Sequence, residues 1–328
     1  MKPQRIEITN KTIIFTILLL LGLKSLWMLR ELAISLFIAF MIMSIIKPLV
    51  NTLEKKKIPP SVSTVIIFII LFTLFGYGLS WFMPPLLADM SSLYGNLTAL
   101  MNHIDPNINQ YINPRILNQY IPDISSRILP IISGIFSNVI FVVTTIFFSI
   151  YFILEKDFFA KFLRVFFKEP DVQKGSRIFR VARERMGAWF WAEVLLMTIV
   201  GASTYVGLSL LGVQHALSLG VIAGIFEAFP VIGPVLSAVP AIIFAAAQSY
   251  PTPYFLVGAT LALYIIIQQL ENNFIVPTVM KKATGLNRIL TLIVLVVGGK
   301  VAGFLGIFIA IPVTLCIDTI LKDRSPTP

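Results

Sequence analysis

Hydrophobic residues in this chain gather into long runs that short polar loops separate. An α-helix needs about 20 consecutive apolar residues to cross a bilayer. The eight apolar runs are 12–29, 32–46, 62–83, 128–154, 189–212, 216–248, 254–270 and 289–320. This pattern predicts an all-α polytopic membrane protein.

The charges of the loops predict which side of the membrane each one faces. Residues 155–188 carry nine basic residues against five acids, and the loops 47–60 and 271–288 are also basic. The loop 88–130 has only two arginines against three aspartates. Because cytoplasmic loops are enriched in Lys and Arg, we expect 88–130 outside and both termini in the cytoplasm.

Two C-terminal segments must leave the membrane on the side from which they enter. Counting the spans from one side of the membrane to the other shows that 214–249 must begin and end on the outer side. In the same way, 289–321 must begin and end on the inner side. Each is 33–36 residues long, whereas two spans and a turn need about 40 or more. We therefore predict about six full spans and two re-entrant or broken helical hairpins.

The two predicted hairpins form an inverted repeat. Each has a glycine-rich middle and a proline in its second half, and His215 to Pro240 has the same spacing as Asn287 to Pro312. Broken helices in corresponding halves of an inverted repeat are typical of transporter binding sites. Their free backbone groups are tolerated only where protein or a water-filled cavity satisfies them.

This topology divides the chain into five parts. They are N-terminal membrane helices at 1–87, an extracytoplasmic amphipathic segment at 88–130, the fourth span with a basic cytoplasmic amphipathic segment at 131–188, a transport core with both hairpins at 189–321, and a cytoplasmic tail at 322–328.

Two amphipathic patterns lie outside the spans. Prolines recur every eight residues from Pro106 to Pro130, which predicts either short surface helices or a proline-punctuated loop. In 155–188, phenylalanines at helical spacing alternate with Lys and Arg. That segment lies either on an anionic inner leaflet or against the bundle.

Composition supports a membrane protein and excludes several other classes. Of 328 residues, 57% are hydrophobic and only 13% charged, against about 25% charged in soluble domains. The net charge of +10 belongs to cytoplasmic loops, so nucleic acid is not an expected partner. One cysteine allows no intramolecular disulfide, and with two histidines it disfavours a structural zinc site.

Charges inside the membrane are the strongest candidates for chemistry. Residues 186–270 contain no Lys or Arg and only two acids, Glu193 and Glu227. A carboxylate in hydrocarbon usually faces a cavity or a partner. Glu227 falls near the turn of the first hairpin, where, if the two hairpin tips meet, it could pair with Lys300 of the second or share a polar substrate with it. Glu193 is closer to an interface, and Glu271 is either a gate group or an interfacial residue.

Several motifs of the last third resemble one family. Glu-Ala-Phe-Pro-Val-Ile-Gly-Pro at 227–234, Gln-Gln-Leu-Glu-Asn at 268–272 and the glycines of 298–306 followed by Pro312 are similar to the autoinducer-2 exporter family of bacterial inner-membrane permeases. The resemblance implies a homo-oligomer, with a pentamer expected, that exports a quorum signal or exchanges monovalent cations for protons. Where the family tends to show an Arg-Gly-Gln-like stretch, this chain has Trp-Ala-Glu at 191–193.

The candidate residues of the substrate or ion path lie in the hairpins and at the inner end of 254–270, with Glu193 added from the fifth span. They are Glu227, Pro230, Gly233, Pro234, Gln268, Gln269, Glu271, Asn272, Gly299, Lys300, Gly303, Gly306 and Pro312.

These features predict a secondary transporter rather than an enzyme. The sequence has no metalloprotease motif and no phosphate-binding loop, so ATP is not the direct energy source, and no cofactor or metal is expected. The leading hypothesis is export of a small polar organic molecule between the hairpins of a bilayer-embedded protein. The alternatives are a monovalent cation/proton antiporter and, from another class, a membrane scaffold that recruits partners through 155–188.

Overall fold

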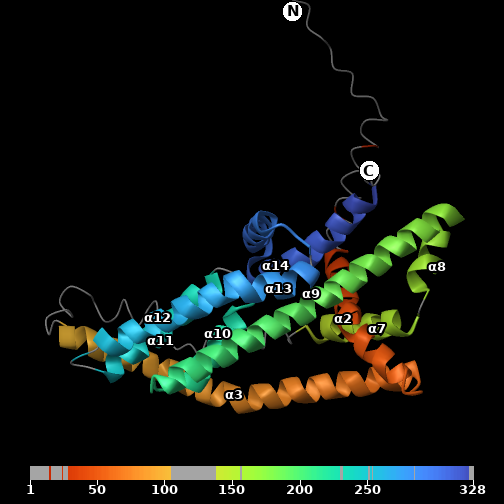
Figure 1. The fold of residues 1–328 in the computed structure, drawn as a ribbon. Coiled ribbons are helices and arrows are strands. Elements are labelled where there is room, and N and C mark those ends of the chain that lie inside the picture. The colour runs from red at the N-terminus through yellow and green to blue at the C-terminus, as the bar shows by residue number, and fades with distance from the viewer. Residues whose placement is uncertain are drawn as a thin grey trace, which may run out of the picture.

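The protein is a bundle of helices (Figure 1). The computed structural model describes residues 15, 24, 29–104, 138–155, 157–229, 232–249, 252, 254–283 and 285–324. Their helices are α2 (Arg30–Glu54), α3 (Pro60–Ile104), α7 (Val139–Leu154), α8 (Phe158–Arg164), α9 (Glu169–Leu210), α10 (Ala216–Phe226), α11 (Ile232–Gln248), α12 (Tyr254–Leu270), the π-helix η1 (Glu271–Ile275), α13 (Val276–Ala283) and α14 (Arg288–Arg324). No strand occurs in these ranges, which confirms the predicted all-α class.

The predicted spans coincide with long apolar helices. Four helical stretches, α2, the first part of α3, α9 and α12 to α13, are long and apolar enough to cross a membrane, and α7 with α8 forms a fifth if counted as one bent span. The run 12–29 lies almost wholly outside the described residues, so the first span stays a prediction. The prolines at 106, 114, 122 and 130 also lie outside them.

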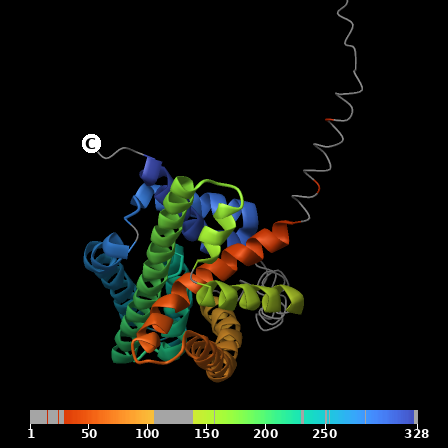
Figure 2. The same cartoon turned by 90° about the vertical axis from the view of Figure 1, so that its right-hand side faces the viewer.

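Helix α9 is the element against which most of the others pack. Its 42 residues span about 63 Å at 1.5 Å per residue, and Figures 1 and 2 show it running through the whole bundle. It contacts α2, α8, α10, α12, α13 and α14. Two boundaries between the parts predicted from the sequence fall inside helices. Helix α9 continues without interruption through position 188, from the basic segment into the span, and α3 continues past position 87.

Apolar clusters hold the bundle together along α9. At one end, Met186 and Trp189 of α9 pack in a core with Met43 of α2 and Leu315 of α14. At the other end, Leu208 belongs to a core that α10, α11 and α12 also supply. Gly212 then adopts φ +72°, a left-handed conformation that favours glycine, and the backbone N–H of Val213 donates to the Leu208 carbonyl. This cap ends α9 and turns the chain into α10.

The segment 214–249 is a helical hairpin, as its length predicts. Helices α10 and α11 pack together, and Gln248 joins the open ends of the hairpin. Its amide nitrogen donates to the Gly212 carbonyl at 2.7 Å, and its amide oxygen accepts from the Gln214 N–H at 2.8 Å. Because the two ends meet, the chain leaves this hairpin beside the point where it entered.

The segment 289–321 is also folded back on itself. Within α14, Ala302 and Gly303 have non-helical backbone angles, with Gly303 at φ +59°. A Cβ placed at Gly298 would collide with the carbonyl oxygen of Gly306, although eight residues of straight helix would separate the two by about 12 Å. The helix is thus broken at Gly303 and its two arms pack closely. The inverted relation between the two hairpins stays a prediction.

Glycines allow α9 and α10 to cross with their backbones in contact. A Cβ at Gly220 would lie 2.9 Å from the Gly201 carbonyl oxygen and 2.7 Å from the Cβ of Tyr205, and a Cβ at Gly224 would lie 2.8 Å from the Met197 carbonyl oxygen. Small residues at such crossings are typical of helix packing in membranes. The crossing fixes the first hairpin to α9.

This packing predicts that Gly220→Ala destabilises the protein by about 1–3 kcal/mol, the range for overpacked sites. Gly258→Ala is the matched control, because nothing lies within 4 Å of a Cβ there, and alanine should be neutral or up to about 1 kcal/mol stabilising in that helix. Thermal unfolding of the detergent-purified variants measures both. Equal melting temperatures for the two variants would contradict the close crossing.

Candidate functional site

Three glutamate side chains are buried inside the bundle, each from a different element. Glu193 of α9 is 5% exposed, Glu227 at the end of α10 is 2% exposed, and Glu271 at the start of η1 is 3% exposed. Carboxyl groups at membrane depth are costly and are rare outside functional positions. We refer to these three residues as the carboxyl cluster.

The tip of the first hairpin buries Glu227. The backbone N–H of Glu227 still bonds to the Ala223 carbonyl, so this residue closes α10. Gly233 then lies against the end of α10, since a Cβ there would collide with the Phe226 carbonyl oxygen and lie 3.3 Å from the Glu227 nitrogen. Only glycine allows α11 to begin this close to the end of α10. The tight tip holds Glu227 away from solvent.

Glu271 lies at an irregularity of the helix that follows. The five residues Glu271–Ile275 form a π-helix between α12 and α13. Short π-helical insertions occur frequently at functional sites, because the extra residue shifts the side chains of one turn. The amide nitrogen of Gln268 lies 3.4 Å from Glu271 Oε2 and donates to it. One predicted amide, Gln268, therefore contacts the carboxyl cluster.

The carboxyl groups of Glu227 and Glu271 lie within hydrogen-bonding reach of each other, and Glu193 lies close enough to interact electrostatically with both. A carboxylate can only accept, so a bond between two carboxyl groups requires that one of them carries a proton. Both oxygens of Glu193 and Oε2 of Glu227 have no hydrogen-bond partner within the described ranges. A proton shared between the two carboxyl groups would satisfy this condition between α10 and η1.

No Lys or Arg forms an ion pair with these acids among the residues that the structure describes. In the same residues, no group of three or more His, Cys, Asp or Glu side chains is placed to hold a metal ion. Within the described residues, the three acids of the carboxyl cluster thus have no basic ion-pair partner.

The second hairpin approaches the same face of α9. The ring of Trp189 contacts Phe308 of α14, with ring centroids 6.1 Å apart. Trp189 and Glu193 are four residues apart on α9, so they lie on one face, one turn from each other. Further along, Gly201 contacts the first hairpin. Helix α9 thus presents Glu193 between its contacts with the two hairpins.

The expected pairing of Glu227 with Lys300 is wrong for this structure. Lys300 is exposed and forms no ion pair in the described part of the chain, whereas the buried Glu227 lies beside Glu271. The matching sequence positions of the two residues did not bring them together, because Glu227 turns inward at its tip and Lys300 faces outward from its arm.

The other candidates are spread over several environments. Gly306 and Pro312 are buried in the second hairpin, Gly299 packs against Ile307, and Gly303 forms the break. Gln269 and Asn272 are exposed, and Gln269 accepts from Asn273 at 3.1 Å. The carbonyl of Pro234 accepts from Ser237 inside α11. Pro230 lies outside the described residues.

Sequence reasoning missed a polar cluster at the other end of the first hairpin. Asp89 Oδ1 of α3 lies 2.6 Å from His215 Nδ1, and Asp89 accepts a short hydrogen bond from Ser218. His215 precedes α10 with φ +61°. These contacts tie the start of α10 to α3. Asp89 lies more than 120 residues before its partners, so only the fold reveals the association.

Comparison with known proteins places the chain in a family. The model of the AI-2E family transporter matches residues 13–324. That is nearly the whole chain. The chain belongs to the AI-2E transporter family.

Relatives of this AI-2E family member carry transport names. A candidate transport protein, YueF, of Bacillus subtilis (strain 168) is 25% identical over 300 residues, covering 85% of this chain and 80% of that protein. A second from the same organism, YrrI, is 24% identical over 310 residues, covering 88% and 84%. A candidate transport protein of Synechocystis, sll0060, is 31% identical over 135 residues, covering 41% and 38%. The family resemblance of the sequence is confirmed, and the protein is a membrane permease.

The hydrogen bond in the carboxyl cluster predicts non-additive stability effects. Glu227→Ala and Glu271→Ala should each destabilise the protein by about 1–3 kcal/mol, because each leaves a buried carboxyl without its partner. The double variant should lose less than the sum, by about 0.5–3 kcal/mol. Thermal unfolding in detergent measures the cycle. Glu184→Ala, whose side chain is 64% exposed, is the control. Strict additivity would mean that the two carboxyl groups do not interact.

Proposed function

We propose that this protein is a secondary transporter that couples solute movement to protons held by Glu227 and Glu271. The supporting observation is the close approach of these two buried carboxyl groups, with Glu193 nearby and no basic partner in the described part of the chain. Groups that change charge inside a membrane protein commonly form proton relays. The proposed path runs between α9 and the two hairpins.

The proposed mechanism follows from the cost of charge in this site. When one of the two carboxyl groups is protonated, the pair shares a proton and a single negative charge. Loss of that proton leaves two adjacent negative charges at low dielectric, which is strongly unfavourable without a replacement cation. A proton and a cation therefore compete for one site, as exchange requires.

This competition favours a monovalent cation as the transported solute. Unpaired carboxyl oxygens supply the negative charge and oxygen ligands that a hard cation prefers. The second candidate, export of a small polar organic molecule, is supported by the family to which the chain belongs and by the broken helices, whose free backbone groups could bind a polar solute. A scaffold role would use neither the buried acids nor the broken helices.

We infer the oligomeric state from the family to which the chain belongs and the membrane orientation from the pattern of charged residues. We place the protein in the bacterial inner membrane as a homo-oligomer, with both termini in the cytoplasm. The basic stretch around α8 and the start of α9 then faces the cytoplasm, where Lys and Arg are enriched.

Proteoliposome flux tests this proposal. Purified protein should acidify or alkalise the vesicle lumen when a sodium or potassium gradient is imposed, and Glu227→Gln should reduce this exchange to the level of empty liposomes. Glutamine keeps the shape and one hydrogen bond but cannot release a proton. Glu184→Gln, at an exposed position of α9, should exchange like the wild type.

A parallel set of vesicles loaded with the quorum signal separates the two solutes. Proton-dependent efflux of the signal without cation exchange would assign the organic substrate and reject the antiporter. Cation exchange that persists in both Glu227→Gln and Glu271→Gln would reject the carboxyl pair as the proton carrier.

A further inference from the structure

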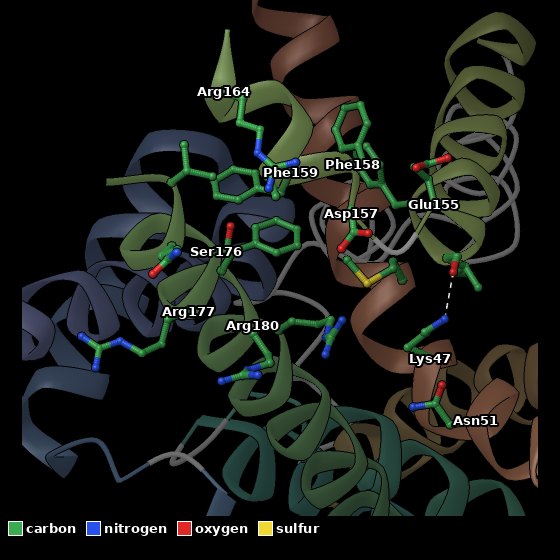
Figure 3. A pocket seen from close by; sticks show the side chains of 18 of the residues that line it. Lys47, Asn51, Glu155, Asp157, Phe158, Phe159, Arg164, Ser176, Arg177 and Arg180 are labelled. Atoms are coloured by element: carbon green, nitrogen blue, oxygen red, sulfur yellow. Dashed lines mark hydrogen bonds between the residues drawn. The ribbon is translucent and has the colours of Figure 1, made fainter. Parts of the chain in front are cut away.

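A cavity of about 580 Å³ lies at the far end of α9 from the first hairpin, enclosed by α2, α7, α8 and α9 (Figure 3). None of the three residues of the carboxyl cluster lines it. Its volume falls within the range of about 300–1,000 Å³ that is usual for small-molecule sites. The cavity is therefore separate from the proposed transport site.

One wall of the cavity is a polar stripe of α9. Gln173, Ser176, Arg180 and Arg183 follow one another at intervals of three or four residues, so they share one face of the helix. Arg180 forms no ion pair among the described residues, and Ser176 Oγ is buried without a hydrogen-bond partner there. Arg183 has only a 3.8 Å contact with its neighbour Glu184. This wall offers guanidinium and hydroxyl donors.

The opposite wall is formed by α2. Figure 3 shows Lys47 and Asn51 across the cavity from Ser176 and Arg180. Lys47 Nζ donates to the Ile153 carbonyl at 2.9 Å, at the end of α7. One turn beyond Asn51, Glu54 Oε1 is buried without a hydrogen-bond partner in the described ranges. This wall therefore presents an unsatisfied acceptor opposite the arginines.

Two of the remaining acids in the lining are already neutralised. Glu155 pairs with Lys161 at 2.6 Å and raises the pKa of that lysine through a hydrogen bond and its charge. Glu169 pairs with Arg164 at 3.2 Å. What is left to meet a ligand is a donor wall on α9 and two acids without an ion pair among the described residues, Glu54 and Asp157.

The mouth of the cavity lies at the expected membrane surface. Helix α8 turns by 91° from the apolar helix α7, so if α7 crosses the bilayer, α8 lies along its surface. Phe162, Val165 and Phe166 on and just after α8 are 52–73% exposed. Exposed aromatic and aliphatic side chains on a surface helix with Lys and Arg are typical of interfacial segments.

From these features we propose that the cavity binds the headgroup of a phospholipid, through a phosphodiester on Arg180, Arg183 and Ser176 and a terminal amine or hydroxyl on Glu54. Arginine is suited to phosphate because its planar guanidinium can donate two parallel hydrogen bonds. Basic pockets between membrane helices on the cytoplasmic side are known to bind such headgroups. The proposal is independent of the function assigned to the carboxyl cluster.

Binding to the delipidated full-length protein in detergent tests this site. Phosphatidylethanolamine and phosphatidylglycerol, whose headgroups end in donors, should bind more tightly than phosphatidylcholine, whose headgroup has none. Native mass spectrometry or a thermal-shift titration measures the affinities. Glycerophosphoethanolamine, which has the same headgroup without acyl chains, serves as the soluble probe.

Two kinds of variant separate the two halves of the site. Arg180→Gln with Arg183→Gln should weaken all three lipids by about tenfold or more, since hydrogen bonds to charged groups are lost. Glu54→Gln should instead remove the preference for phosphatidylethanolamine over phosphatidylcholine. Lys55→Ala with Lys56→Ala is the control, because it removes two exposed cations that do not line the cavity.

The affinities for the lipids and for the soluble probe show whether the bound group comes from a lipid or from a soluble phosphodiester. Tight binding of the lipids with weak binding of the soluble probe supports a lipid site, and equal binding of both supports a soluble phosphodiester as the source of the same group. The proposal is overturned if the double arginine variant binds all three lipids with the same affinity as the wild type and the lysine control. If that variant does not fold, Ser176→Ala and Glu54→Gln test the same proposal. Wild-type lipid affinity and wild-type headgroup preference in both of these variants would reject the site.

Discussion

The close approach of the buried Glu227 and Glu271 carboxyl groups is the constraint on which the arrangement of the transport core depends. Two carboxyl groups at membrane depth can remain together only if they share a proton and if protein surrounds them. The surrounding structure meets both conditions. The glycine at 233 brings α11 over the end of α10, and the π-helix carries Glu271 to the same point. An ordinary apolar bundle would need neither irregularity.

The long helix α9 relates this site to the rest of the molecule. Its glycine at 201 fixes the first hairpin by backbone contact, its tryptophan at 189 contacts the second, and Glu193 lies between them. Because Trp189 and Glu193 occupy one face, a shift of the second hairpin along α9 would change the surroundings of Glu193. A carboxyl cluster at such a junction can be sensitive to the relative positions of both hairpins.

Much of the fold could be predicted from the sequence, and the reasons are local. Apolar runs indicated the helices, and segment length together with glycine and proline indicated both hairpins, because these signals act over a few residues. The partner of Glu227 could not be found in this way. Position in a repeat suggested Lys300, but orientation around the helix axis decides contact, and the π-helix that carries Glu271 has no sequence signal of its own. The contacts of Asp89 with His215 and Ser218 likewise depend on packing between segments that are distant in the sequence.

Because α9 is continuous, it could transmit the effect of a ligand in the cavity between α2, α7, α8 and α9 to the carboxyl cluster. From Arg183 to Glu193 is ten residues, about 15 Å along the helix, with no break in α9 between them. A ligand on the arginines can influence the acids mechanically if it holds α9 in a different position relative to its neighbours. Coupling by this route requires that α9 moves as one rigid rod. The packing of the Leu163 side chain of α8 against Gly175 favours such motion, because it joins the surface helix α8 closely to the start of α9.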